Sequence, residues 1–133
     1  MKKFIRVIVL VMACVLVFAT LASCGKSIDN IEKKAKDAGF EVEVEKLEEA
    51  DEDGVVAIIE IVDPNAKTLF GAEAIAYEFK DADSAKKAYE DAKEELEKAE
   101  EAAAAIGMDT GSVVKRSGKI VIMGSEDIVK KVW

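Results

Sequence analysis

Residues 83–106, DSAKKAYEDAKEELEKAEEAAAAI, decide the fold class of this chain. Their apolar members recur at spacings of three and four residues, which is the period of one face of an α-helix. We expect Asp83 or Ser84 to cap the start of this helix. Leu96 lies in the middle of the apolar stripe among alanines, so Leu96→Ala is expected to cost about 2–5 kcal/mol by emptying space against a sheet. One long helix between groups of short alternating segments predicts a mixed fold in which helices pack against a sheet.

Three strand-like segments precede the long helix. Residues 40–47, FEVEVEKL, and residues 71–80, GAEAIAYEFK, alternate in side-chain character, as half-buried strands do. Residues 55–62, VVAIIEIV, are apolar on both faces except at Glu60, which predicts a central strand covered on both sides. One face of residues 71–80 consists of alanines, and this face predicts that the long helix approaches the sheet closely. We expect the aromatic residues Tyr77 and Phe79 in the core.

The remaining segments complete one domain. Residues 27–40, SIDNIEKKAKDAGF, and residues 125–133, SEDIVKKVW, predict short helices, the first capped by Ser27 or Asp29. Residues 112–123, SVVKRSGKIVIM, predict a β-hairpin that turns at Ser117-Gly118. The element order is therefore α-β-β-β-α-β-β-α. Short connections between consecutive strands predict an α+β fold, an antiparallel sheet of about five strands with helices on one main face.

The first 24 residues have the three regions of a secretory signal in the right order. Residues 1–6 carry three cations and no acid, residues 7–18 are apolar, and a zone rich in small residues follows. The quartet LASC at 21–24 resembles the lipobox of bacterial lipoproteins, in which a diacylglyceryl group is attached to the cysteine thiol and the chain is cut just before it. The resemblance implies a signal peptide at 1–23 and lipid attachment at Cys24. An uncleaved transmembrane helix is the alternative, and it also leaves the rest of the chain outside the cytoplasmic membrane.

Cleavage before Cys24 would leave a short tether at 24–27 and a single α+β domain at 28–133. Removing the three cations of the signal leaves 16 basic residues against 27 acidic ones, a net charge of about −11. We expect such a surface to repel nucleic acid and anionic lipid headgroups. The two acyl chains on Cys24 would anchor the protein stably in the membrane, whereas one chain binds only marginally.

An acidic stretch before the second strand resembles a calcium-binding loop. In residues 49–60, EADEDGVVAIIE, Asp51 and Asp53 take the third and fifth positions of an EF-hand loop, and Glu60 takes the twelfth. An EF-hand needs a helix on each flank, whereas both flanks here are strand-like. We therefore predict an acidic hairpin turn and assign no metal site. A weak cation site formed by Asp51 and Asp53 alone stays open.

Two further motifs receive structural interpretations. Residues 108–112, MDTGS, contain the active-site triplet of aspartic proteases, but those enzymes need two such aspartates in a fold made almost entirely of strands. We expect Asp109 and Thr110 to bind backbone groups in a turn. Residues 115–119, KRSGK, form a cationic hairpin tip, which is expected to be solvated or to contact lipid phosphates or an acidic wall polymer.

These observations predict a membrane-anchored lipoprotein on the extracytoplasmic face that is not an enzyme and binds an envelope protein or a small ligand. The chain has no histidine, and its remaining cysteine would carry lipid, so we assign no catalytic or cofactor-binding residue. Outside the lipobox the chain resembles small lipoproteins of the bacterial envelope, which implies no activity. The alternative is a small hydrolase with paired carboxylates. An uncovered apolar sheet face would favour binding or a homodimer, and converging carboxylates of raised pKa would favour the enzyme.

Overall fold

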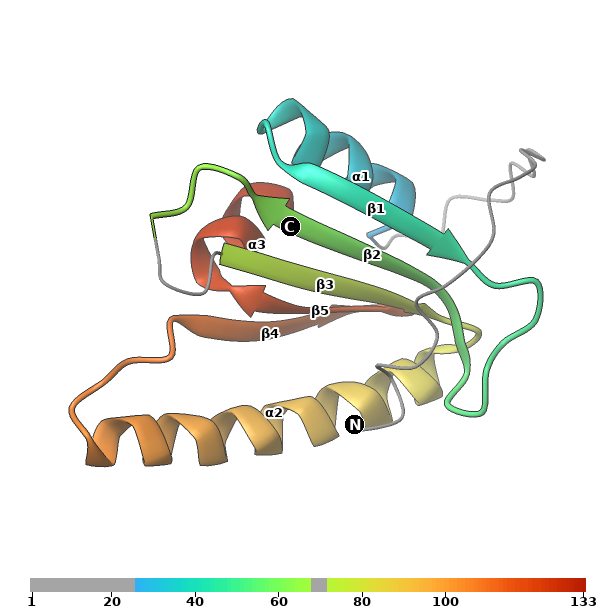
Figure 1. Cartoon of the computed structure of the whole chain (residues 1–133). Coiled ribbons are helices and arrows are strands. Elements are labelled where there is room, and N and C mark those ends of the chain that lie inside the picture. Colours follow the sequence, from blue (N-terminus) through green and yellow to red (C-terminus); the bar gives the residue numbers. More distant parts are fainter. Residues whose placement is uncertain (1–25, 68–71) are drawn as a thin grey trace.

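A computed structural model describes residues 26–67 and 72–133, which form one sheet and three helices (Figure 1). The elements are α1 (Ile28–Asp37), β1 (Glu41–Lys46), β2 (Val55–Asp63), β3 (Ala72–Phe79), α2 (Ala82–Ala105), β4 (Ser112–Ser117), β5 (Ile120–Ser125) and α3 (Glu126–Val132). This order confirms the predicted α+β fold. The proposed signal peptide and Cys24 lie outside the described residues.

The five strands form one antiparallel sheet in the order β1-β2-β3-β5-β4. Strand β2 lies between β1 and β3 and is therefore a central strand, as predicted. Its face toward α1 and α3 is buried, whereas on the other face Ile58 and Glu60 are half-buried and Val62 is exposed, so the predicted cover on both sides is only partial there. Strand β5 lies between β3 and β4, so the last hairpin joins the sheet through its second strand. The turn of that hairpin is Gly118-Lys119, one residue later than predicted, because Ser117 still pairs with Ile120.

The larger core lies between helices α1 and α3 and one face of the sheet. Alternate residues of β2 and β5 point into it, because successive side chains of a strand point to opposite faces. Ser27 accepts a hydrogen bond from the backbone N–H of Asn30 and so caps α1, as predicted. The fully buried large side chains of this core include Ile31, Ile59, Ile61, Ile120, Ile122, Ile128, Val129 and Val132.

Helix α2 packs on the other face of the sheet, mainly against β3, β4 and β5, so the prediction of helices on one main face is wrong (Figure 1). The prediction for the alanines of β3 is also wrong. Ala74 and Ala76 point toward α1 and α3, whereas Tyr77 and Phe79 belong to the core under α2. Helix α2 itself presents the small side chains of Ala85 and other alanines to this face. Large side chains of the strand therefore meet small ones of the helix, which fills the space better than alanine against alanine.

The start of α2 and the place of Leu96 also differ from the predictions. The helix is capped by Asp81, whose carboxylate accepts a hydrogen bond of 2.7 Å from the backbone N–H of Ser84. Leu96 is only half-buried and belongs to neither core. The 24 residues of α2 span about 36 Å, whereas the six residues of β4 span only about 20 Å. Helix α2 is therefore longer than this strand and extends past it.

Candidate functional site

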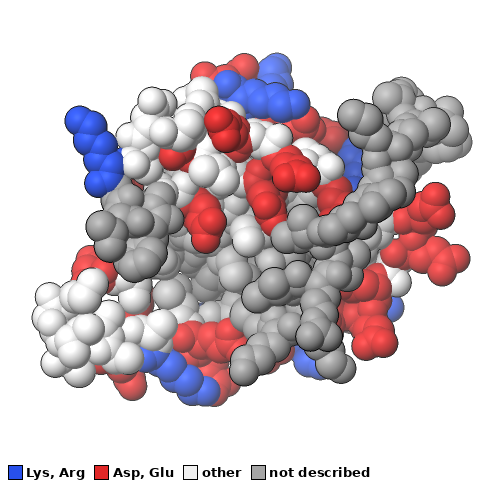
Figure 2. All heavy atoms as spheres, viewed as in Figure 1, with Lys and Arg blue, Asp and Glu red and all other residues white. Residues whose placement is uncertain are grey.

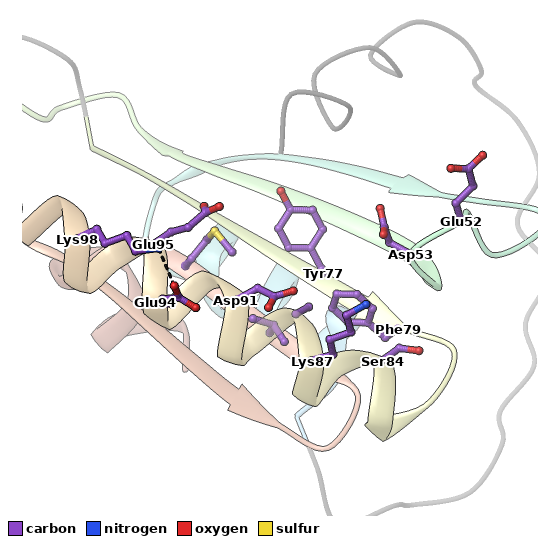
Figure 3. Close-up of a pocket in the computed structure, with 13 residues that line it drawn as sticks. Glu52, Asp53, Tyr77, Phe79, Ser84, Lys87, Asp91, Glu94, Glu95 and Lys98 are labelled. Carbon is purple, nitrogen blue, oxygen red and sulfur yellow. Dashed lines mark hydrogen bonds and ion pairs between the residues drawn. The ribbon is translucent and has the colours of Figure 1, made fainter.

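A groove of about 630 Å³ lies between helix α2 and the sheet face that it covers (Figure 3). We call it the α2 groove. Strands β3 and β5 form its floor, one side of α2 forms its wall, and the β1–β2 loop closes one end. The lining residues are Glu52, Asp53, Tyr77, Phe79, Ser84, Lys87, Ala88, Asp91, Glu94, Glu95, Lys98, Val121 and Met123.

The floor of the groove is apolar and aromatic. Tyr77 and Phe79 are two residues apart in β3 and therefore point to the same face, with ring centroids 6.4 Å apart. Val121 lies directly opposite Tyr77 in β5, and Met123 follows two residues later on the same face. Phe79 and Val121 are buried, whereas Tyr77 and Met123 are half-buried. The floor therefore presents apolar and aromatic surface that is in contact with solvent in part.

The wall of the groove is a stripe of α2 next to the stripe that enters the core. Ser84, Lys87, Asp91, Glu94 and Lys98 follow one another at intervals of three and four residues, so they lie on one side of the helix. The helix reaches the sheet through Ala85 and Ala92, the two residues of α2 that are buried. Ala88 and Tyr89 are half-buried and pack against the same core. The neighbouring stripe borders the groove and does not close it.

The charges around the groove are mainly negative. Five carboxylates and two ammonium groups line it, which gives a net charge of −3. Lys98 forms an ion pair with Glu94, 2.6 Å from nitrogen to oxygen and one helical turn apart. In Figure 3 the acidic side chains of α2 and those of the β1–β2 loop lie on different sides of the aromatic floor. The groove therefore combines an apolar floor with an acidic rim.

The acidic character continues over the sheet beside the groove. Glu43 of β1 and Glu60 of β2 lie directly opposite each other on the face that carries α2, although like charges in this position are destabilising. Burial raises the pKa of Tyr77, and the nearby charge of Glu60 raises it further. Figure 2 shows acidic side chains among other residues over this part of the molecule. Helix α2 lies mainly against β3, β4 and β5, so no described helix covers most of β1 and β2 on this face.

One carboxylate of the groove, that of Glu94, has a shifted pKa. A carboxylic acid that donates a proton near neutral pH needs a raised pKa. The pKa of Glu94 is lowered, because Lys98 donates a hydrogen bond to its carboxylate and adds a favourable positive charge. Within residues 26–67 and 72–133 no charged side chain is fully buried. The lowered pKa keeps the Glu94 carboxylate ionised at neutral pH.

The acidic stretch before β2 forms a hairpin connection, as predicted. One carboxylate oxygen of Asp51 accepts hydrogen bonds from the backbone N–H groups of Asp53, at 3.0 Å, and Val55, at 2.8 Å. Glu60 lies in the middle of β2 and is paired across the sheet with Glu43. In the described part of the chain no group of three or more acidic, histidine or cysteine side chains is arranged to hold a metal ion.

The other two motifs, unlike the β1–β2 loop, contribute no residue to the groove lining. The carboxylate of Asp109 accepts a hydrogen bond from the N–H of Gly111 at 2.9 Å, and Thr110 bonds to the backbone of Ser112, which confirms the predicted turn. In the cationic tip, Arg116 donates a hydrogen bond to the carbonyl of Gly118 at 3.3 Å. Whether the tip contacts phosphates or a wall polymer stays a prediction.

The pattern of residues 71–80 predicts Tyr77 and Phe79 in the core and predicts no groove. Phe79 is buried in the core under α2, and Tyr77 packs against that core while staying half-buried at the groove floor. The feature of the sequence that could have indicated the groove is the second apolar face of residues 71–80, besides the face with the alanines. Which face the long helix would cover could not be read from that pattern.

No described helix has the length and apolar character needed to cross a membrane. Comparisons of the chain with models of protein families, with curated proteins and with solved structures found no significant match.

Proposed function

We propose that this chain is a lipid-anchored lipoprotein of the cell envelope whose extracytoplasmic α+β domain binds a partner in the α2 groove without catalysing a reaction. The observation that carries the proposal is the partly exposed apolar floor under α2. Exposed apolar surface costs roughly 25 cal/mol per Å² relative to buried surface, so a domain built for stability alone would close this space. The volume of about 630 Å³ lies in the range of ligand-binding clefts.

The anchor and the groove would lie on opposite sides of the sheet. Lys26 is the first described residue, and its ammonium group lies 5.4 Å from the centre of the Trp133 ring. It also donates a hydrogen bond to the backbone oxygen of Trp133, which packs against the core between α1 and α3. Cys24 is two residues before Lys26, a distance of at most about 7 Å along the chain. A lipid on Cys24 would therefore hold the α1–α3 side toward the bilayer and leave the groove accessible.

Photo-crosslinking in living cells tests the groove as a binding site. Replacing Ala88, which lines the groove, by p-benzoylphenylalanine should give a crosslinked product on illumination. The matched control places the same photoreactive residue at Ala102, an exposed alanine of the same helix outside the groove. We expect the product at position 88 and not at position 102. No product at either position, or the same product at both, would contradict binding in the groove.

A further inference from the structure

We infer that the occupant of the α2 groove is a basic amphipathic peptide segment of another protein, with apolar side chains on the groove floor and lysine or arginine side chains at its acidic rim. This inference rests on the proposed function and names the chemistry of the partner. Three properties of the groove support a partner of this kind: the length of the groove, the apolar character of its floor and the position of its charges.

The length of the groove suits a peptide segment better than a small molecule. The wall extends along α2 from Ser84 to Lys98, which is about 21 Å at 1.5 Å per residue. An extended segment of about six residues, or a helical segment of about fourteen, covers the same distance. The floor lies along this wall, so a bound segment could place several side chains in it.

The floor selects apolar side chains. Tyr77 and Met123 are half-buried there, and both present apolar surface beside the buried ring of Phe79. Aromatic rings and methionine adapt to varied apolar partners and are common where peptides bind. The floor thus supplies affinity for an apolar face and little preference for its exact sequence.

The charges select a cationic partner. Asp91 and Glu95 of α2 lie along one side of the floor, and Asp53 of the β1–β2 loop lies at its end. The opposed glutamates Glu43 and Glu60 extend the negative surface across the sheet. Like charges placed this close repel one another, and a lysine or arginine side chain between them would relieve that repulsion. A domain of about −11 overall would also steer cationic partners toward this face.

Binding of designed peptides to the lipidated protein in nanodiscs of neutral phosphatidylcholine tests the inference. The probe is a labelled peptide of about fourteen residues with leucines at helical spacing and lysines on the opposite face. Three further peptides serve as controls. The glutamine peptide and the glutamate peptide carry that residue in place of every lysine, and the serine peptide carries serine in place of every leucine. Empty nanodiscs provide the blank for each peptide. We expect measurable binding of the leucine–lysine peptide above the blank and none of the glutamate peptide.

Removal of rim charges shows whether the groove is the site. The double variant Asp91→Asn/Glu95→Gln should weaken binding of the leucine–lysine peptide by about twofold to thirtyfold. It removes two ion pairs with the peptide, and each exposed ion pair contributes about 0.2–1 kcal/mol. The control Asp37→Asn/Asp127→Asn changes the net charge equally on α1 and α3, across the sheet from the groove. We expect the control to bind as the wild type does. Affinity should also fall as salt is raised.

The outcomes separate this inference from the proposed function. If the glutamine peptide binds as tightly as the lysine peptide, and if Ala88→Phe weakens both, the groove is a binding site but its partner is not basic. Equal weakening by the two double variants would also overturn the inference, because only net charge would then matter. If the serine peptide binds as tightly as the leucine peptide, the floor has no role. Failure of every peptide, with the expected crosslink at position 88, overturns the inference alone. If no peptide binds and no crosslink forms at position 88, the proposed function is overturned as well.

Discussion

Replacing Gly124 by alanine tests the pairing of β3 with β5, on which both cores depend. Gly124 lies in β5 between Ala74 of β3 and Val113 of β4, and its φ angle is 137°. A Cβ atom added here would lie 2.4 Å from the carbonyl oxygen of Glu73 and 2.5 Å from the Cα of Ala74. Both are backbone atoms, so no side-chain rotation can make room, and the two strands would have to separate.

The cost of Gly124→Ala has two parts. Forcing extra atoms into a packed region costs about 1–3 kcal/mol, and holding a residue with a side chain at an unfavourable positive φ costs about 1–3 kcal/mol. We therefore expect a loss of about 2–6 kcal/mol, which is a large share of the stability of a small domain. Urea unfolding of the chain from residue 24 onward, followed by the fluorescence of its single tryptophan, Trp133, measures the loss.

The matched control is Gly118→Ala in the turn of the neighbouring hairpin. Gly118 also has a positive φ, 57°, but nothing lies within 4 Å of an added Cβ. Its loss should be only the backbone part, about 1–2 kcal/mol. Equal losses for the two variants would refute the reasoning, because they would mean that β3 and β5 do not approach as closely as the structure has them.

Three other predictions concern the core, the cap of α2 and the anchor. Ile59→Ala should lower the free energy of unfolding by about 2–5 kcal/mol because Ile59 is fully buried. Leu96→Ala should lower it by less than about 1 kcal/mol. Urea unfolding that ranks the two losses in the opposite order would contradict the placement of α2. Hydrogen bonds from the backbone and from the side chain of Ser84 lower the pKa of Asp81 below its ordinary value of 3.8. The stabilisation of the fold by the Asp81 carboxylate is therefore present at neutral pH and is lost as the pH falls through the lowered pKa. Asp81→Ala should therefore lower the melting temperature at pH 7, and its difference from the wild type should shrink as the pH falls below about 4. Asp83→Ala is the control, and a difference that does not shrink as the pH is lowered would argue against the cap. Cys24→Ser should leave residues 1–23 attached and remove the lipid, and mass spectrometry that finds an unmodified Cys24 in the wild type would exclude the anchor.

The elements and their order could be predicted because side-chain periodicity is a local property. The alternation in residues 40–47 and the three-and-four spacing in residues 83–106 depend only on neighbours in the chain, and both correspond to elements of the structure. No local pattern decides the cap of α2, since the side chains of Asp81, Asp83 and Ser84 can all accept the required hydrogen bond. The structure assigns that role to Asp81.

The candidate site could not be predicted in the same way. Its floor combines Tyr77 with Val121, which belong to strands separated in the chain by α2 and β4. Its wall depends on which stripe of α2 borders the sheet, and its acidic rim on where the β1–β2 loop ends. Each of these relations is made by packing between distant segments, so no local pattern records it.

The sequence by itself determined the number, type and order of the elements, the acidic balance of the domain and the lack of histidine, because each is a property of composition or of local spacing. Only the tertiary structure decided that α2 lies on the face opposite α1 and α3, and that Leu96 lies outside the cores. Strand β3 has two apolar faces, one of alanines and one with Ile75, Tyr77 and Phe79, and either can be buried. The choice between them depends on how well their volumes match the helices that pack on each side.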